Sequence, residues 1–210
     1  MTRVRVVVPS ERHVQRARER GEDAETRDAL RARLVAALVA DVFAGAGEVR
    51  VALGEALPEV AREDALLAPL LREGGATWTR TVAAIDAAIG VLRGGMVDDA
   101  ILARVPMARA KTLVAATRAL DAALARVGRV DARCAPARLA KAIGEIDPER
   151  VRDAVGADAV VARWIVAWDA ADAAWWSALD AALRRAGGGA TIELAAIDAP
   201  LDADRERAPL

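Results

Sequence analysis

The chain of 210 residues has very few of the side chains on which most active sites depend. It contains one histidine (His13), one cysteine (Cys134), no tyrosine and no asparagine, and its only serines are Ser10 and Ser177. Hydrolytic and metal chemistry needs several such groups close together, so the composition argues against both. A single cysteine cannot form an internal disulfide, which fits a reducing cytoplasm. We therefore expect no catalytic residue, no bound metal and no cofactor.

Long apolar runs and an excess of positive charge are also missing. No run approaches the roughly 18 apolar residues that a membrane span needs, and Pro9 ends the short apolar stretch near the N-terminus. Both observations favour a cytoplasmic protein without a membrane partner. The charge is 30 basic against 31 acidic residues, a net of −1, so the chain as a whole has no field that would gather nucleic acid. Any contact with DNA must come from a local patch.

The chain begins with a pattern typical of an α/β fold. Residues 4–8 are mostly β-branched and are followed by Pro9, which predicts a strand buried on both faces of a parallel sheet. Ser10 then stands where a helix N-cap is expected, and residues 11–20 form the predicted helix. The opening unit is therefore a strand, a tight turn and a short helix.

The middle and the end of the chain differ in their apolar spacing. Between residues 26 and 148 the apolar residues recur every three or four positions, which indicates a block of helices. Residues 160–168 and 190–195 predict two strands, and the helix between them makes a βαβ crossover. We expect an α/β fold that is mostly α by content, with a small parallel sheet built from the N-terminal strand and this βαβ unit. The expected domains are a sheet domain (1–25 and 149–197), a large helical insertion (26–148) and a flexible tail (198–210).

Motifs for nucleotide hydrolysis and nucleophilic catalysis are weak. The sequence has no Gly-x-x-x-x-Gly-Lys-Ser/Thr loop, so the phosphates of a nucleotide have no evident cradle. Ser10 with His13 as its base would suit a nucleophile, although no acid is clearly placed to orient the imidazole. Asp169 and Asp172 suit acid–base work or magnesium, or they are the N-cap and N3 residues of a helix. The structural interpretation is favoured for the serine and for both carboxylates.

Two features favour binding rather than catalysis. Four tryptophans near the C-terminus could stack on nucleobases, although packing of a helix on the sheet would use the same residues: Trp164, Trp168, Trp175 and Trp176. The first twenty residues hold six arginines against two glutamates, and the arginines are Arg3, Arg5, Arg12, Arg16, Arg18 and Arg20. Arg12, beside Ser10 and the free N–H groups at a helix start, would suit a backbone phosphate. The alternative is a solvated helix face without a ligand.

The segment Val-Arg-Val-Val-Val-Pro-Ser-Glu-Arg-His at 4–13 resembles AddB/RexB-type subunits of bacterial ATP-dependent helicase–nucleases, in which a strand ends in Val-Pro-Ser-x-Arg. In that family the segment is similar to motif Ia of superfamily 1 helicases, which touches single-stranded DNA. The resemblance implies that Pro9, Ser10 and Arg12 contact DNA, with Arg16 beside them. It also implies that Asp169 and Asp172 lie at a degenerate motif II, where the family's acidic pair falls on Ala167 and Trp168. The family's later motor domain and nuclease motif are missing from these 210 residues.

Three hypotheses of function follow. The first is a non-catalytic, helicase-like module, a fragment or degenerate relative, that binds single-stranded DNA or serves as a scaffold in double-strand-break repair. The resemblance implies a helicase–nuclease subunit as its partner. The second is a helical module for protein–protein interaction without a DNA role. The third is a small hydrolase that uses Asp169 or Ser10.

Overall fold

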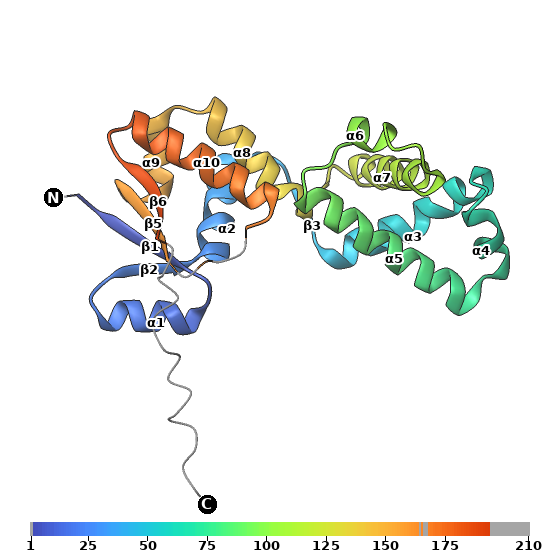
Figure 1. Cartoon of the computed structure of the whole chain (residues 1–210), viewed down its shortest axis with the longest axis horizontal. Helices are drawn as coiled ribbons and strands as arrows, with labels where there is room; N and C mark the ends of the chain where they lie inside the picture. The colour runs from blue at the N-terminus through green and yellow to red at the C-terminus, as the bar shows by residue number, and fades with distance from the viewer. Residues whose placement is uncertain (1, 164, 166–167, 194–210) are drawn as a thin grey trace, which may run out of the picture.

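The computed structural model describes residues 2–163, 165 and 168–193, and it divides them between a lobe with a parallel sheet and a lobe made of helices (Figure 1). The sheet lobe contains both ends of the described chain. The helical lobe is formed by the middle of the sequence. The two lobes lie side by side along the longest axis of the molecule.

The sheet consists of β1 (Val4–Val8), β2 (Asp23–Thr26), β5 (Ala159–Arg163) and β6 (Gly189–Glu193), in the order β2-β1-β5-β6. All its neighbouring strands are parallel, and Val6 pairs with Ala24 on one side and with Val161 on the other. The predicted α/β class, with an N-terminal strand and a C-terminal βαβ unit, is confirmed. Strand β2 was not predicted. Strand β5 covers the first part of the predicted strand 160–168, of which residues 164, 166 and 167 lie outside the described residues.

Helices cover the two faces of the sheet unequally. Because alternate residues of a strand point to opposite faces, Val6 and Val8 pack against α1 (Glu11–Glu19), whereas Val7 belongs to the core on the other face. That second, larger core is covered by α2 (Arg27–Leu38), α8 (Ala135–Glu145), α9 (Pro148–Val155) and α10 (Ala170–Arg185). Figure 1 shows α1 on one side of the sheet and these four helices on the other.

The helical lobe has a core of its own. The lobe consists of α3 (Ala46–Glu63), α4 (Leu67–Glu73), α5 (Gly75–Gly94), α6 (Asp99–Ala103) and α7 (Ala108–Arg126). Its fully buried residues include Leu53, Leu57, Ile89 and Leu120, and none of them belongs to the core of the sheet lobe. Apolar side chains at helical spacing therefore fold into two separate cores.

The chain enters and leaves the helical lobe at one place. Strand β3 (Phe43–Ala44) pairs with β4 (Val130–Asp131), and a 3-10 turn, η1 (Ala132–Cys134), leads back to the sheet lobe. Asp131 is buried there and forms ion pairs with Arg93 and Arg133. Arg133 also donates to the backbone and to the side chain of Asp86, at 2.7 and 2.8 Å. This charge cluster ties α5 to the connection that returns to the sheet lobe.

The limits of the helical block differ from the expected 26–148. Helix α2 places Leu30, Leu34 and Leu38 in the core under the sheet, and α8 adds Leu139 and Ile143 to the same core. These helices therefore pack on the sheet, and the separate lobe is shorter than the predicted insertion. Residues 194–210, which include the predicted tail 198–210 and the end of the predicted sheet domain, lie outside the described residues. Within the described part of the chain, no helix is both long and apolar enough to span a bilayer.

Candidate nucleic-acid interface at the carboxyl edge of the sheet

The order of the strands singles out one position at the edge where they end. From β1 the chain crosses through α1 to β2, and from β5 it crosses through α10 to β6, which lies on the opposite side. Neighbouring strands β1 and β5 are therefore the point at which the winding direction changes. Open parallel sheets bind ligands outside the carboxyl ends of two such strands. Pro9 and Ser10 follow β1, and Asp169 follows β5, so the topology brings both groups of predicted site residues to this edge.

Ser10 is the N-cap residue of α1, but its side chain does not cap the helix. Its backbone is extended, with φ −152° and ψ 163°, and its hydroxyl makes no bond to the backbone N–H groups of the first turn. The Ser10 Oγ atom lies 2.7 Å from His13 Nδ1 instead. The predicted capping bond is therefore replaced by a serine–histidine pair within one helical turn, the same two groups that the hydrolase hypothesis requires.

Arg12 and Arg16 lie on the outer face of α1. Val14 and Ala17 are the buried residues of this helix, which directs Arg12 and Arg16 away from the sheet. The two arginines are four residues apart and therefore stand one above the other along the helix. Both are exposed, and within the described ranges neither forms an ion pair. Two adjacent guanidinium groups of this kind suit successive phosphates.

Other arginines of the N-terminal cluster have structural partners. Arg5 bonds to Asp23 at 2.9 Å and to Glu25 at 3.3 Å, and its Nη1 donates to the carbonyl of Val155 at 2.8 Å. Arg18 donates to the carbonyl of Ala24 at 3.3 Å, and Arg20 pairs with Glu22. The arginines near the N-terminus therefore fall into two groups: some bind acids or carbonyls of the protein, whereas Arg12 and Arg16 on α1 have no ion-pair partner among the described residues.

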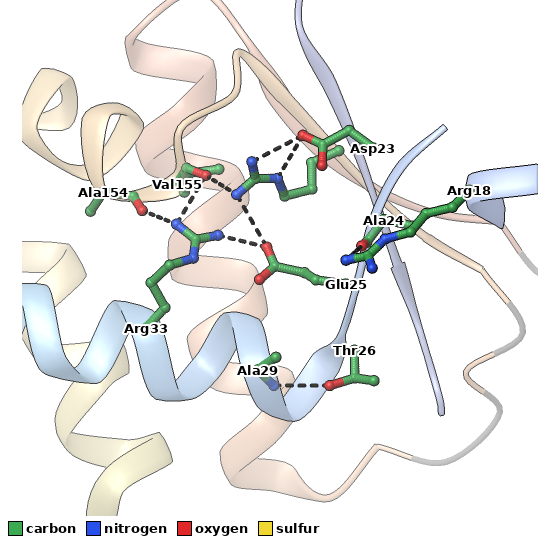
Figure 2. A network of polar contacts seen from close by, with 10 residues as sticks. Arg18, Asp23, Ala24, Glu25, Thr26, Ala29, Arg33, Ala154 and Val155 are labelled. Carbon is green, nitrogen blue, oxygen red and sulfur yellow. Dashed lines mark hydrogen bonds and ion pairs between the residues drawn. The ribbon is translucent and has the colours of Figure 1, made fainter. Parts of the chain in front are cut away.

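Figure 2 shows the network around Glu25, which explains why a strand as polar as β2 forms. Arg33 of α2 pairs with Glu25 at 2.6 Å and also donates to the carbonyls of Ala154 and Val155. Those carbonyls end helix α9, where helices leave acceptors without partners and favour positive charge. Glu25 therefore links the edge strand to two helices.

Asp169 and Asp172 take the structural positions that the sequence favoured. Asp169 is the N-cap of α10, and its side chain accepts from the Asp172 backbone N–H at 2.7 Å. The Asp172 side chain is 5% exposed and pairs with Arg27 at 2.9 Å and with Arg31 at 2.8 Å. The indole N–H of Trp175 adds a third donor at 2.9 Å. The Asp172 carboxylate is thus occupied in joining α2 to α10.

The sequence analysis did not identify Arg27 and Arg31 as partners of Asp172. Their spacing of four residues at the start of α2 places them on one side of the helix, which is a visible signal. The acid that they bind is 141 residues away from Arg31, so nothing local identifies it.

The helical lobe also reaches this edge, because a Cβ on Gly94 of α5 would lie only 3.2 Å from Asp169 Oδ2.

The tryptophans pack together rather than form an open platform. Trp175 and Trp176 are buried, and the ring of Trp168 lies 5.2 Å from that of Trp176 and 6.4 Å from that of Trp175. The Arg27 guanidinium stands 5.7 Å from the Trp168 ring centre. Packing therefore accounts for these three residues, and Trp164 lies outside the described residues.

The described side chains include no group of three or more histidine, cysteine, aspartate or glutamate residues that could hold a metal ion. Cys134 is a half-buried free thiol at the junction of the lobes, and burial raises its pKa. Arg12 and Arg16, with Pro9 and Ser10 beside them, therefore remain the candidate interface.

No protein-family model and no curated protein matches this sequence.

Proposed function

We propose that this protein is a non-catalytic, helicase-like module that binds the backbone of single-stranded DNA at the carboxyl edge of its sheet. The observation that carries the proposal is the pair Arg12 and Arg16, which are exposed, aligned on α1 and without an ion-pair partner in the described part of the chain. Arg12 comes two residues after Ser10, at the start of the helix that leaves the switch point, and Arg16 lies one turn further along the outer face of α1. The resemblance of 4–13 to AddB/RexB-type subunits points to Pro9, Ser10 and Arg12 among these residues.

The mode of binding follows from the chemistry of these groups. A guanidinium donates two parallel hydrogen bonds to one phosphate, and the first N–H groups of α1 favour a negative charge at the helix start. Contacts of this kind hold the strand in place without reading its sequence. We therefore expect the binding of single-stranded DNA to show weak sequence preference and strong salt dependence. The proposal also includes a place in the bacterial cytoplasm, in double-strand-break repair, beside a helicase–nuclease subunit.

The test is the affinity for a fluorescently labelled oligothymidine, measured by anisotropy over a range of salt concentrations. We expect the affinity to fall steeply with salt, with a slope that decreases by about 0.7 for each phosphate contact removed. Arg12→Ala and Arg16→Ala should each weaken binding and lower the slope. Arg150→Ala is the matched control, because Arg150 is also exposed but lies on α9, across the sheet.

Binding that is undetectable, independent of salt or equally reduced by Arg150→Ala would contradict the proposal. The remaining candidate would then be a helical module for protein–protein interaction without DNA. The hydrolase hypothesis rests on the 2.7 Å contact between Ser10 and His13 alone. It predicts ester hydrolysis that Ser10→Ala abolishes.

A further inference from the structure

The helical lobe carries an exposed apolar surface around its shortest helix, α6. Ile101 is 50% exposed, Val105 36% and Met107 57%. Ile101 belongs to α6, which ends at Ala103, and Val105 follows in a turn in which its N–H bonds to the carbonyl of Leu102 at 3.0 Å. The N–H of Met107 in turn bonds to the carbonyl of Val105 at 2.8 Å, which keeps Met107 next to Val105. The three exposed apolar residues therefore lie on one short stretch of chain that runs from α6 through a turn to the start of α7.

Three cations lie on the same stretch of chain as these apolar residues. Arg104, Arg109 and Lys111 are exposed, and within the described residues none of them forms an ion pair. The nearest acids in the sequence are already engaged: Asp98 accepts from the N–H of Ile101 at 2.8 Å, and Asp99 pairs with Arg118 at 2.6 Å. The α6 patch, defined as Ile101, Arg104, Val105, Met107, Arg109 and Lys111, thus combines apolar surface with unneutralised positive charge.

The start of α7 departs from what helix stability favours. Met107 is its N-cap residue and makes no side-chain cap, and its first turn holds basic but no acidic residues. Helix starts favour an oxygen-bearing cap and negative charge, as found at the starts of α2 and α10. The starts of α4, α5 and α8 also lack a side-chain cap and an acidic first turn, but the start of α7 adds the cations Arg109 and Lys111. A bound partner with carboxylates would supply the negative charge that this helix start lacks.

We infer that the α6 patch binds an acidic segment of a partner protein that also presents apolar side chains. Carboxylates of the segment would pair with Arg104, Arg109 and Lys111, while its apolar side chains cover Ile101, Val105 and Met107. Methionine and arginine are enriched at protein interfaces, and the flexible thioether of Met107 adapts to the shape of its partner. A phosphate backbone would match the cations but would leave the three apolar side chains exposed, which favours a protein as the partner.

Synthetic peptides test this inference on the full chain. The probe is a fluorescent peptide of about 18 residues, long enough to form a helix, with glutamates on one face and leucines on the other. One control peptide has alanine in place of leucine, and the other has lysine in place of glutamate. We expect the acidic, leucine-bearing peptide to bind at least about tenfold more tightly than either control, a difference of about 1.4 kcal/mol.

Variants of the patch make the test specific. Met107→Glu should weaken binding of the acidic peptide by about tenfold, whereas Val51→Glu should leave it unchanged, because Val51 is an exposed valine of α3 outside the patch. A triple variant, Arg104→Glu, Arg109→Glu and Lys111→Glu, should transfer the preference to the lysine peptide. Circular dichroism should give wild-type melting for all variants, since every altered residue is exposed.

Several results would overturn the inference. They are failure of every peptide to bind, equal effects of Met107→Glu and Val51→Glu, and no change of preference in the triple variant. Patch-dependent binding of anionic phosphatidylserine vesicles or of oligothymidine, in place of the acidic peptide, would overturn it as well. Arg12→Ala should leave peptide binding unchanged, so this test and the DNA test fail independently.

Discussion

The two lobes differ in what their arginines contact. In the sheet lobe, buried or half-buried acids such as Asp172 and Glu25 hold arginines from neighbouring elements, and the side chains that remain available stand on α1. In the helical lobe, Asp131 plays this part at the junction, whereas the segment around α6 keeps its cations beside apolar residues. The comparison teaches that the partner acid, and not the local density of arginine, decides which cations are structural.

Removal of a central acid should have the largest effect. Asp172→Ala removes the buried carboxylate that Arg27 and Arg31 share, although both arginines keep Asp28, so we expect the free energy of unfolding to fall by about 3 kcal/mol. Urea unfolding followed by circular dichroism measures this. Asp23→Ala removes an exposed partner of Arg5 and should cost less than about 1 kcal/mol. Similar losses in the two variants would break the distinction between interior and surface pairs.

A truncation in each core should show that the lobes are separate. Leu34→Ala and Leu120→Ala each leave a cavity in a fully buried site, and each should cost about 3 kcal/mol. Amide hydrogen exchange should accelerate mainly in the lobe that holds the altered leucine. Uniform acceleration across both lobes in either variant would mean that the two cores open as one unit.

Replacement of a single cation should distinguish the exposed surface of α1 from the α6 patch. Arg12→Ala should lower the salt slope for oligothymidine by about 0.7, whereas Arg109→Ala should leave that slope unchanged and weaken only the acidic peptide. Fluorescence anisotropy with both probes measures the effects side by side. If both variants reduced DNA binding equally, the two surfaces would belong to one electrostatic footprint and the contrast between them would disappear.

The smallest effect is expected at Asp180 of α10. Burial opposes ionisation of its carboxyl group, but hydrogen bonds from Arg184 and from the Ala190 backbone N–H outweigh it, so the pKa of Asp180 lies below its ordinary value. A lowered pKa contributes stability above the unfolded value of about 3.9, and this contribution is lost as the pH falls through the folded pKa. Asp180→Asn should therefore lower stability by less than about 1 kcal/mol at pH 7. At about pH 2 the difference should shrink, as urea unfolding at the two pH values would show.

Local patterns predicted much of the sheet lobe. The β-branched run at Val4–Val8 gave β1, and Asp169 with Asp172 gave the start of α10, which the structure confirms. Strand β2 escaped because Asp-Ala-Glu-Thr has no apolar alternation. Its polar side chains are stabilised by Arg5 and Arg33, which only the folded chain brings to it. Pairings over such distances leave no periodic trace in a sequence.

The candidate site was predictable only in part. Arg12 and Arg16 could be placed on one stripe of a helix from their spacing, and Pro9 could be placed at the end of a strand. The sequence could not separate these arginines from Arg5, because that separation depends on Asp23 and Val155 in the folded chain. The bond between Ser10 and His13 was equally hidden, since a serine before a helix normally caps it.

The pairing of β3 with β4 has a consequence for the history of the protein. Val130 donates to the carbonyl of Val42 at 2.9 Å, so the points at which the chain departs from the sheet lobe and returns to it are adjacent. A unit attached through two neighbouring joints can be gained, exchanged or lost without separating the strands of its host. The helical lobe therefore has the architecture of a cassette whose two ends meet at one joint.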